Sequence, residues 1–117
     1  MYIKGSIVTY SNEAKMKFLD VDKEILDTKG AVSPEVAKQM AEGVRKAVGS
    51  DIGVGITGIA GPTGGTDKKP VGLVYIAVAG KDNTVVKENV FSGDRARVRY
   101  RSTQQALEMI RQYIKNK

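Results

Sequence analysis

The sequence predicts a three-layer α/β/α domain with a small mixed sheet whose last strands are antiparallel. The stretch Ile52–Thr57 alternates apolar residues with glycine or threonine, the period of two that is typical of a strand. Gly72–Ala79 is a nearly unbroken apolar run, as expected for a central strand that is covered on both faces. Between Ser33 and Gly49, apolar residues recur at helical spacing. With 117 residues, the chain is long enough for one domain with a single core.

The first thirty residues predict a strand and two short helices. Met1–Tyr10 contains residues that favour strands, although Gly5 weakens its middle. Ser11 can cap a short helix that carries Lys15, and Asp22 can cap a second one. We therefore expect a further strand before the long helix that follows.

That long helix has the clearest predicted boundaries. Ser33 is the expected N-cap, and Gly49 is expected to end the helix. Its apolar face repeats every four residues: Val36, Met40 and Val44. This pattern predicts a scaffold helix whose apolar face packs on the sheet.

A hairpin and a final helix complete the predicted fold. Gly80–Asn83 is turn-like, and Thr84–Phe91 is less apolar than Gly72–Ala79, which indicates a strand nearer an edge. Two strands that are joined by such a short turn are antiparallel. The final helix is expected to begin at Gly93 and Asp94. Its predicted buried stripe is Thr103, Ala106, Leu107, Ile110 and Ile114.

The glycine-rich loop after Ile52–Thr57 is the first candidate binding site. Its glycines, from Gly58 to Gly72, can take positive φ and expose successive N–H groups, which form concavities suited to anions. Lys68 and Lys69 add positive charge. The loop matches no standard phosphate fingerprint, so by itself it predicts a small anionic or polar ligand without naming it. The alternative is a connection without function, but long loops in compact domains are uncommon unless they are functional.

Composition limits the chemistry that the chain can perform. There is no Cys and no His, so catalysis would have to use Ser, Thr, Tyr, Lys, Asp or Glu, and nothing predicts a metal or cofactor. The net charge of +6 permits nucleic-acid binding, but acids are interspersed among the bases and no aromatic–basic cluster offers a stacking platform. Nucleic acid is therefore not an expected partner. No apolar run approaches a membrane span, and no signal peptide is evident, so we expect a cytoplasmic protein that does not contact a membrane.

Two further sets of residues are candidates for chemistry. Tyr10 and Lys15 could meet above the sheet edge, where a lysine in a dry pocket can act as a base. On spacing alone, a surface lysine beside a half-buried tyrosine is the simpler interpretation. Arg95 is the first of four arginines in the first turns of the final helix, where cations oppose the helix dipole unless an anion is bound. A basic surface helix explains these arginines about equally well.

Four motifs resemble one known family. TGIAGPTGGTDKKPVGLVYIA, which begins at Thr57, is similar to the central signature of the C-terminal domain of competence/damage-inducible protein A (CinA). VTYSNEAK from Val8, GAVSPEVAKQMAEG from Gly30 and FSGDRARVR from Phe91 also fit this family, in the right order. The family is similar in activity to nicotinamide-nucleotide amidases. These enzymes hydrolyse the carboxamide of nicotinamide mononucleotide (NMN) to the acid and ammonia.

The resemblance implies roles for particular residues. Tyr10 and Lys15 match residues that activate the nucleophile and would handle protons. Lys69 and Arg95 would hold the phosphate of a small-molecule nucleotide substrate, and the loop would supply amide donors. The implied substrate-binding residues are Thr57, Gly58, Ala60, Gly61, Gly64, Gly65, Lys69 and Arg95.

The nucleophile of the family has no match by motif in this sequence. Similar domains begin with a further helix–strand–helix unit. This unit carries a segment that reads roughly Glu-Ser-Cys-Thr-Gly-Gly, and the serine of that segment is taken to be the nucleophile. We therefore expect residues 1–117 to be a single domain that is N-terminally truncated relative to the family and hydrolyses NMN poorly. The strand beside Ile52–Thr57 would be missing, which predicts a longer natural product, a shifted first strand or a homo-oligomer. The alternative function is a non-catalytic nucleotide-binding or protein-interaction module.

Overall fold

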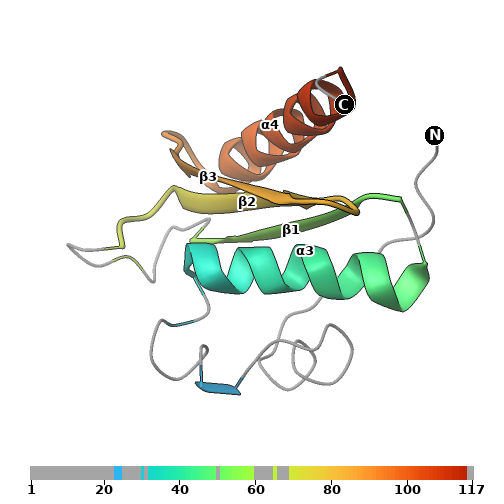
Figure 1. Cartoon of the computed structure of the whole chain (residues 1–117). Helices are drawn as coiled ribbons and strands as arrows, with labels where there is room; N and C mark the ends of the chain where they lie inside the picture. The colour runs from blue at the N-terminus through green and yellow to red at the C-terminus, as the bar shows by residue number, and fades with distance from the viewer. Residues whose placement is uncertain are drawn as a thin grey trace.

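The computed structural model describes residues 23–24, 30, 32–49, 51–59, 65 and 69–115. Its elements are, in chain order, α3 (Pro34–Val48), β1 (Gly53–Gly58), β2 (Leu73–Ala79), β3 (Thr84–Val90) and α4 (Arg95–Lys115). Figure 1 shows that α3 lies on one face of the sheet and α4 on the other. The predicted three-layer α/β/α fold is thereby confirmed.

The three described strands form an antiparallel sheet in the order β1-β2-β3. β2 is the central strand, and all but one of its residues are buried, as its apolar sequence predicts. The predicted antiparallel hairpin of β2 and β3 is confirmed, and Gly80 N–H donates to Asn83 O across its turn. The mixed character of the predicted sheet depended on Met1–Tyr10, which lies outside the described residues.

α3 begins and ends where its capping residues predict. Ser33 is the N-cap, and its Oγ accepts a hydrogen bond from Val36 N–H at 3.3 Å. Gly49 ends the helix with φ of +66°, a left-handed conformation that favours glycine. Val36, Met40 and Val44 are all buried, which confirms the predicted apolar face.

The glycine face of β1 allows α3 to pack backbone against backbone. A Cβ on Gly53 would overlap the carbonyl oxygen of Ala41, and a Cβ on Gly55 would lie 2.5 Å from that of Ala37. No real Cβ approaches an oxygen so closely, so only glycine fits at these positions. The glycines between Ile52 and Thr57 therefore serve the approach of a helix.

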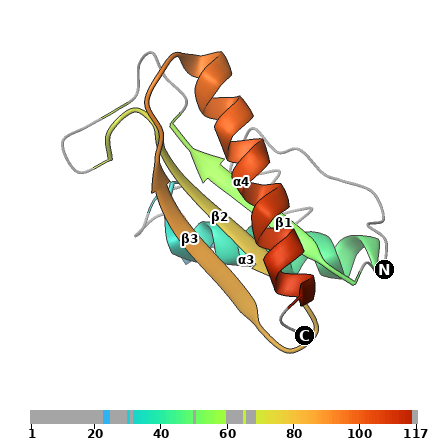
Figure 2. The same cartoon turned by 90° about the horizontal axis from the view of Figure 1, so that it is seen from above.

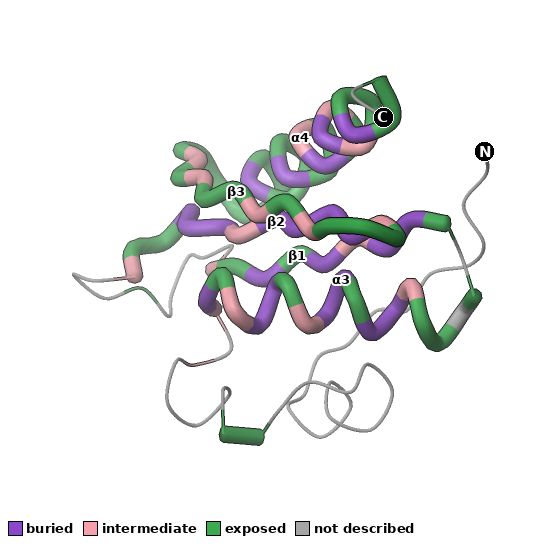
Figure 3. Tube along the Cα trace, viewed as in Figure 1, coloured by how far each residue is buried: buried purple, intermediate pink, exposed green. Residues whose placement is uncertain are grey.

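The predicted buried stripe of α4 is wrong at three of its five positions and confirmed at Ala106. The buried residues of α4 are Val98, Ser102, Ala106, Met109 and Tyr113. Thr103 is exposed, Leu107 is 60% exposed, Ile114 is 44% exposed, and Ile110 is partly buried. Two apolar stripes run along this helix, and the structure turns the stripe of Val98 and Met109 toward the sheet. Figure 3 shows the buried and exposed positions alternating along α4.

Contacts at both ends of α4 select this orientation. At its start, Asp94 Oδ1 accepts a hydrogen bond from Arg97 N–H at 2.8 Å, in the manner of an N-cap. In its last turns, the Tyr113 hydroxyl lies 2.8 Å from Oδ1 of Asn83, in the hairpin turn. The Tyr113 ring also covers Gly80, where any Cβ would overlap it. These tertiary contacts fix which face of α4 is buried.

We predict that Gly55→Ala lowers the free energy of unfolding by about 3 kcal/mol, because neither β1 nor the Ala37 carbonyl can move without disturbing the core. Gly49→Ala is the matched control. Its new Cβ meets nothing within 4 Å, so only the left-handed φ contributes, at about 1 kcal/mol. Urea denaturation measures both values. Equal losses for the two variants would contradict the backbone contact between α3 and β1.

Candidate functional site

One end of the sheet gathers most of the described candidate residues. In register, Gly58 at the end of β1 lies opposite Val74, and Leu73 at the start of β2 lies opposite Val90. Figures 1 and 2 show that α3 and α4 both begin at this end. We call it the loop end, defined by Gly58, Leu73 and Val90.

Backbone hydrogen bonds close the base of the glycine-rich loop. Ile59 N–H donates to Leu73 O at 2.9 Å, and Gly72 N–H donates to Ile59 O at 2.6 Å. Gly72 has φ of +96°, and a Cβ there would overlap the carbonyl oxygen of Phe91. Phe91 N–H in turn donates to Gly72 O at 2.9 Å. The two arms of the loop are therefore held at fixed positions beside the ends of β1 and β3.

Lys69 brings its positive charge to the start of α3. A Cβ on Gly30 would lie 3.0 Å from Lys69 Nζ, so the amine lies directly against Gly30. The Gly30 carbonyl accepts a hydrogen bond from Ser33 Oγ at 2.9 Å, and Ser33 caps α3. The amine and the positive end of the helix dipole are therefore neighbours, and both favour an anion.

The remaining described loop residues present mainly backbone groups to a ligand. Thr57 is buried, in register with Tyr75 on β2. Gly58 and Gly65 are exposed, but a Cβ on either would lie under 3 Å from backbone atoms of the returning arm. This close approach requires glycine and leaves peptide groups as the parts that a ligand can contact.

Arg95 lies at the loop end, at the start of α4, whereas Lys69 lies against Gly30 near the start of α3. Arg95 is exposed and is the first residue of α4. α4 packs on the opposite face of the sheet from α3 (Figure 1). A ligand that contacts both Lys69 and Arg95 would therefore have to reach the starts of both α3 and α4.

Five predicted site residues lie outside the described residues: Tyr10, Lys15, Ala60, Gly61 and Gly64. Their roles in proton transfer and amide donation therefore stay predictions.

The sequence patterns did not predict a hydrogen-bonded pair that lies next to Thr57. Tyr75 OH donates to Glu88 Oε1 at 2.7 Å. This hydrogen bond, burial, and the negative charges of Glu88 and Glu35 raise the pKa of Tyr75 to about 12. Tyr75 is therefore a hydrogen-bond donor at neutral pH and not a base. The pairing follows from the register of β2 and β3, so the hairpin turn was the signal that could have revealed it.

Glu35 adds an acceptor to the same face of the sheet. It lies in the first turn of α3, and its Oε2 is buried with no hydrogen-bond partner among the described residues. A buried acceptor without a donor is costly, so this atom suits an N–H or O–H group of a ligand.

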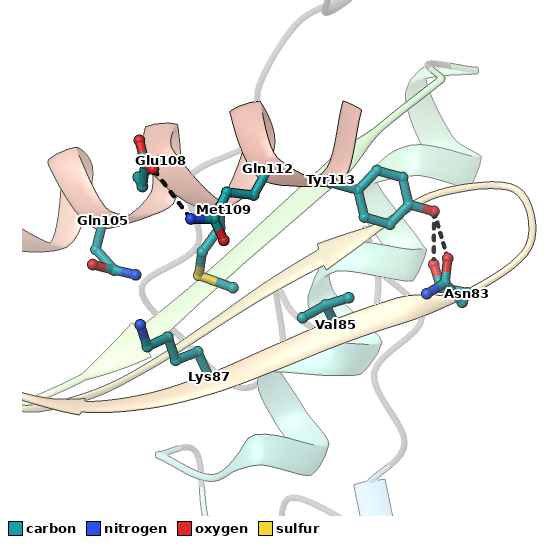
Figure 4. Close-up of a pocket in the computed structure, with 8 residues that line it drawn as sticks. All are labelled: Asn83, Val85, Lys87, Gln105, Glu108, Met109, Gln112 and Tyr113. Atoms are coloured by element: carbon teal, nitrogen blue, oxygen red, sulfur yellow. Dashed lines mark hydrogen bonds between the residues drawn. The ribbon is translucent and has the colours of Figure 1, made fainter. Parts of the chain in front are cut away.

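A separate cavity of about 440 Å³ lies between β3 and α4. Figure 4 shows Lys87 and Gln105 directed into it from the two elements, with the Met109 side chain beside them. Among the predicted site residues that the structure describes, none lines this cavity.

Neither a metal site nor a membrane span is evident in the part of the chain that the structure describes. There, no three or more Asp, Glu, His or Cys side chains gather closely enough to hold a metal ion. Likewise, none of the described helices is both long and apolar enough to cross a membrane.

The CinA C-terminal domain profile matches residues 1–114. The chain belongs to the CinA C-terminal domain family. It is 56% identical over 109 residues to a putative competence-damage inducible protein of Moorella thermoacetica, covering 93% of this chain and 26% of that protein. It is 51% identical over 115 residues to a CinA-like protein of Syntrophomonas wolfei, covering 98% of this chain and 28% of that protein. The chain thus spans about a quarter of the length of these curated relatives.

Solved CinA-family structures share the fold. The competence/damage inducible protein CihA of Agrobacterium tumefaciens superimposes with a TM-score of 0.85 at 41% identity, over 87% of this chain and 63% of that one. A CinA superfamily protein of Enterobacter cloacae gives 0.84 at 32% identity, over 89% and 62%. The predicted family is thereby confirmed.

We predict that Glu88→Ala lowers the pKa of Tyr75 from about 12 toward 10, because the acceptor and its charge are both removed. An absorbance titration of the phenolate measures this pKa, and Tyr75→Phe identifies the step that belongs to Tyr75. Glu108→Ala, in the exposed Arg111 salt bridge, is the control and leaves the step unchanged.

The same pair makes stability depend on alkaline pH. The folded state holds the Tyr75 proton more tightly than the unfolded chain, whose tyrosine pKa is 10.0. The contribution of this pair is therefore fully present below pH 10 and is lost as the pH rises toward 12. Tyr75→Phe should lack this decline, and an identical decline in both proteins would contradict the assignment.

Proposed function

We propose that the loop end binds the phosphate of NMN and that the domain serves the deamidation of this nucleotide. The observation that supports this most directly is the Lys69 amine against Gly30, beside the Ser33-capped start of α3. A phosphate there would face a cation and a helix N-terminus together.

Lys69 is the main phosphate contact in this proposal. Pro34 has no N–H, and the Val36 N–H is already bonded to Ser33 Oγ, so α3 contributes mostly through its dipole. Arg95 would contact the nucleotide from the other face of the sheet. Glu35 Oε2 would accept a hydrogen bond from the nucleotide, for which the carboxamide N–H is a suitable donor.

The proposed chemistry is nucleophilic acyl transfer. In the family resemblance, a serine attacks the carboxamide carbon, the amide nitrogen leaves as ammonia, and water then releases the carboxylic acid. Lys15 with Tyr10 would move the protons, and loop amides would stabilise the oxyanion. No residue of 1–117 matches that serine by motif, so we propose that these residues alone bind NMN weakly and hydrolyse it poorly.

Ammonia release from NMN by residues 1–117, with Lys15→Ala as the comparison, tests this proposal. Absent activity together with an NMN-dependent rise in Tm would support a binding site without its nucleophile. Activity that Lys15→Ala abolishes would show that the nucleophile lies within 1–117 and would contradict the proposed deficit. If NMN produced neither hydrolysis nor a Tm shift, the protein-interaction module would be the better account.

We predict that Lys69→Ala weakens NMN binding about tenfold, because one charge-assisted contact to the phosphate is lost. Isothermal titration calorimetry measures the Kd. Lys81→Ala is the matched control, since Lys81 is exposed in the hairpin turn at the other end of the sheet. Nicotinamide riboside, which lacks the phosphate, should bind wild type and Lys69→Ala equally. Equal weakening of both ligands would contradict a phosphate contact.

A further inference from the structure

α4 carries a second apolar stripe that its own sheet leaves exposed. Tyr100, Leu107 and Ile114 follow one another at seven-residue spacing and are 61%, 60% and 44% exposed. Thr103 and Ile110 lie between them at the positions that complete a heptad pattern. We call these five residues the α4 stripe.

The α4 stripe lies on a different side of the helix from the residues that are buried. Residues seven apart lie almost on one line of a helix, so its members form a continuous seam. The buried residues Val98, Met109 and Tyr113 form a different line that faces the sheet. Ile110 is partly buried and packs against the core cluster, so it borders both the buried residues and the exposed members of the stripe.

The surroundings of the stripe are strongly basic. α4 contains five Arg and one Lys but a single acidic residue, Glu108. That carboxylate is already bonded to Arg111, whose Nη2 lies 2.7 Å from Oε1. Arg99 precedes Tyr100, and Arg111 follows Ile110, so a guanidinium group lies beside the seam toward each of its ends.

We propose that the α4 stripe is a docking surface for an acidic amphipathic helix that presents apolar residues at the same heptad spacing. The spacing matches knobs-into-holes packing of two helices, and flanking charges choose the partner of such a seam. An acidic partner would bring its carboxylates to Arg99, because Arg111 is already paired with Glu108. This inference is independent of the proposed NMN site, which lies at the loop end.

Two other occupants fit the surface less well. A second copy pairing through α4 would place two strongly basic helices side by side, which costs electrostatic energy. An anionic membrane would satisfy the charges, but a helix that lies in a membrane surface needs a broad apolar face free for lipid. On α4, the other half of the apolar surface is buried against the sheet.

The test uses a synthetic helical peptide about three heptads long, with Leu at a and d and Glu at e and g. Fluorescence anisotropy with residues 1–117 should show binding. Leu107→Gln should weaken it about tenfold or more, because the central apolar contact is lost. Val85→Gln is the matched control: Val85 is also an exposed aliphatic residue, at 45%, but it lies on β3. It should leave the Kd unchanged.

Further experiments test the contribution of charge to binding and distinguish the acidic helix from the two other occupants. The same peptide with Lys in place of Glu should bind at least about tenfold more weakly. Tyr100→Gln should reproduce the loss seen with Leu107→Gln, and melting temperatures verify that both variants fold. Absent binding, or equal binding by Leu107→Gln, overturns the proposal. So does self-association in sedimentation that Leu107→Gln abolishes, or binding to phosphatidylserine vesicles that Leu107→Gln abolishes and the acidic peptide does not inhibit.

Discussion

The contact between the backbones of α3 and β1 is the constraint on which the rest of the structure depends. Gly53 and Gly55 leave no side chains between helix and strand, so the carbonyls of Ala37 and Ala41 lie almost on the strand itself. That contact sets both the distance and the direction of α3. Because α3 runs antiparallel to β1, its capped start falls at the same end of the sheet as the exit of β1. Gly30, Ser33 and Lys69 lie close together as a consequence of this geometry.

The loop end divides its charges between the two faces of the sheet. On the α3 face, a cation lies close to a helix start, while Tyr75 and Glu88 form a neutral donor and its acceptor nearby. On the α4 face, Arg95 opens a basic helix. Gly72 has no Cβ, so the start of β2 can lie directly against the backbone of Phe91. The start of β2 and the end of β3 are therefore close together at this end of the sheet. A ligand with an anionic and a polar end suits such a divided site better than a compact ion does.

Local chemistry made part of this fold predictable. Ser33 and Gly49 mark the ends of α3 because caps depend on only a few neighbouring residues, and the hairpin follows from its turn. The stripe of α4 was mispredicted because two apolar lines both satisfy helical periodicity, and only contacts distant in sequence, such as Tyr113 with Asn83, select between them. Tyr75 and Glu88 meet through strand register, and Lys69 meets Gly30 through the path of the loop, so neither pairing is visible in a local pattern. The proposed roles of Tyr10 and Lys15 stay predictions, as both lie outside the described residues.

The hydroxyl of Tyr113 joins the last turns of α4 to a turn thirty residues earlier. Its ring also fills the space that the missing Cβ of Gly80 leaves open. The hairpin and α4 therefore form one closed structural unit, with Phe91 and Gly72 joined at one end and Tyr113 and Asn83 at the other. A rigid fusion partner that continues α4 beyond Lys115 would act on this unit directly, because a twist of the final turn would be transmitted to the β2–β3 turn. A flexible glycine–serine spacer at that point keeps the two ends of the unit mechanically separate from whatever follows.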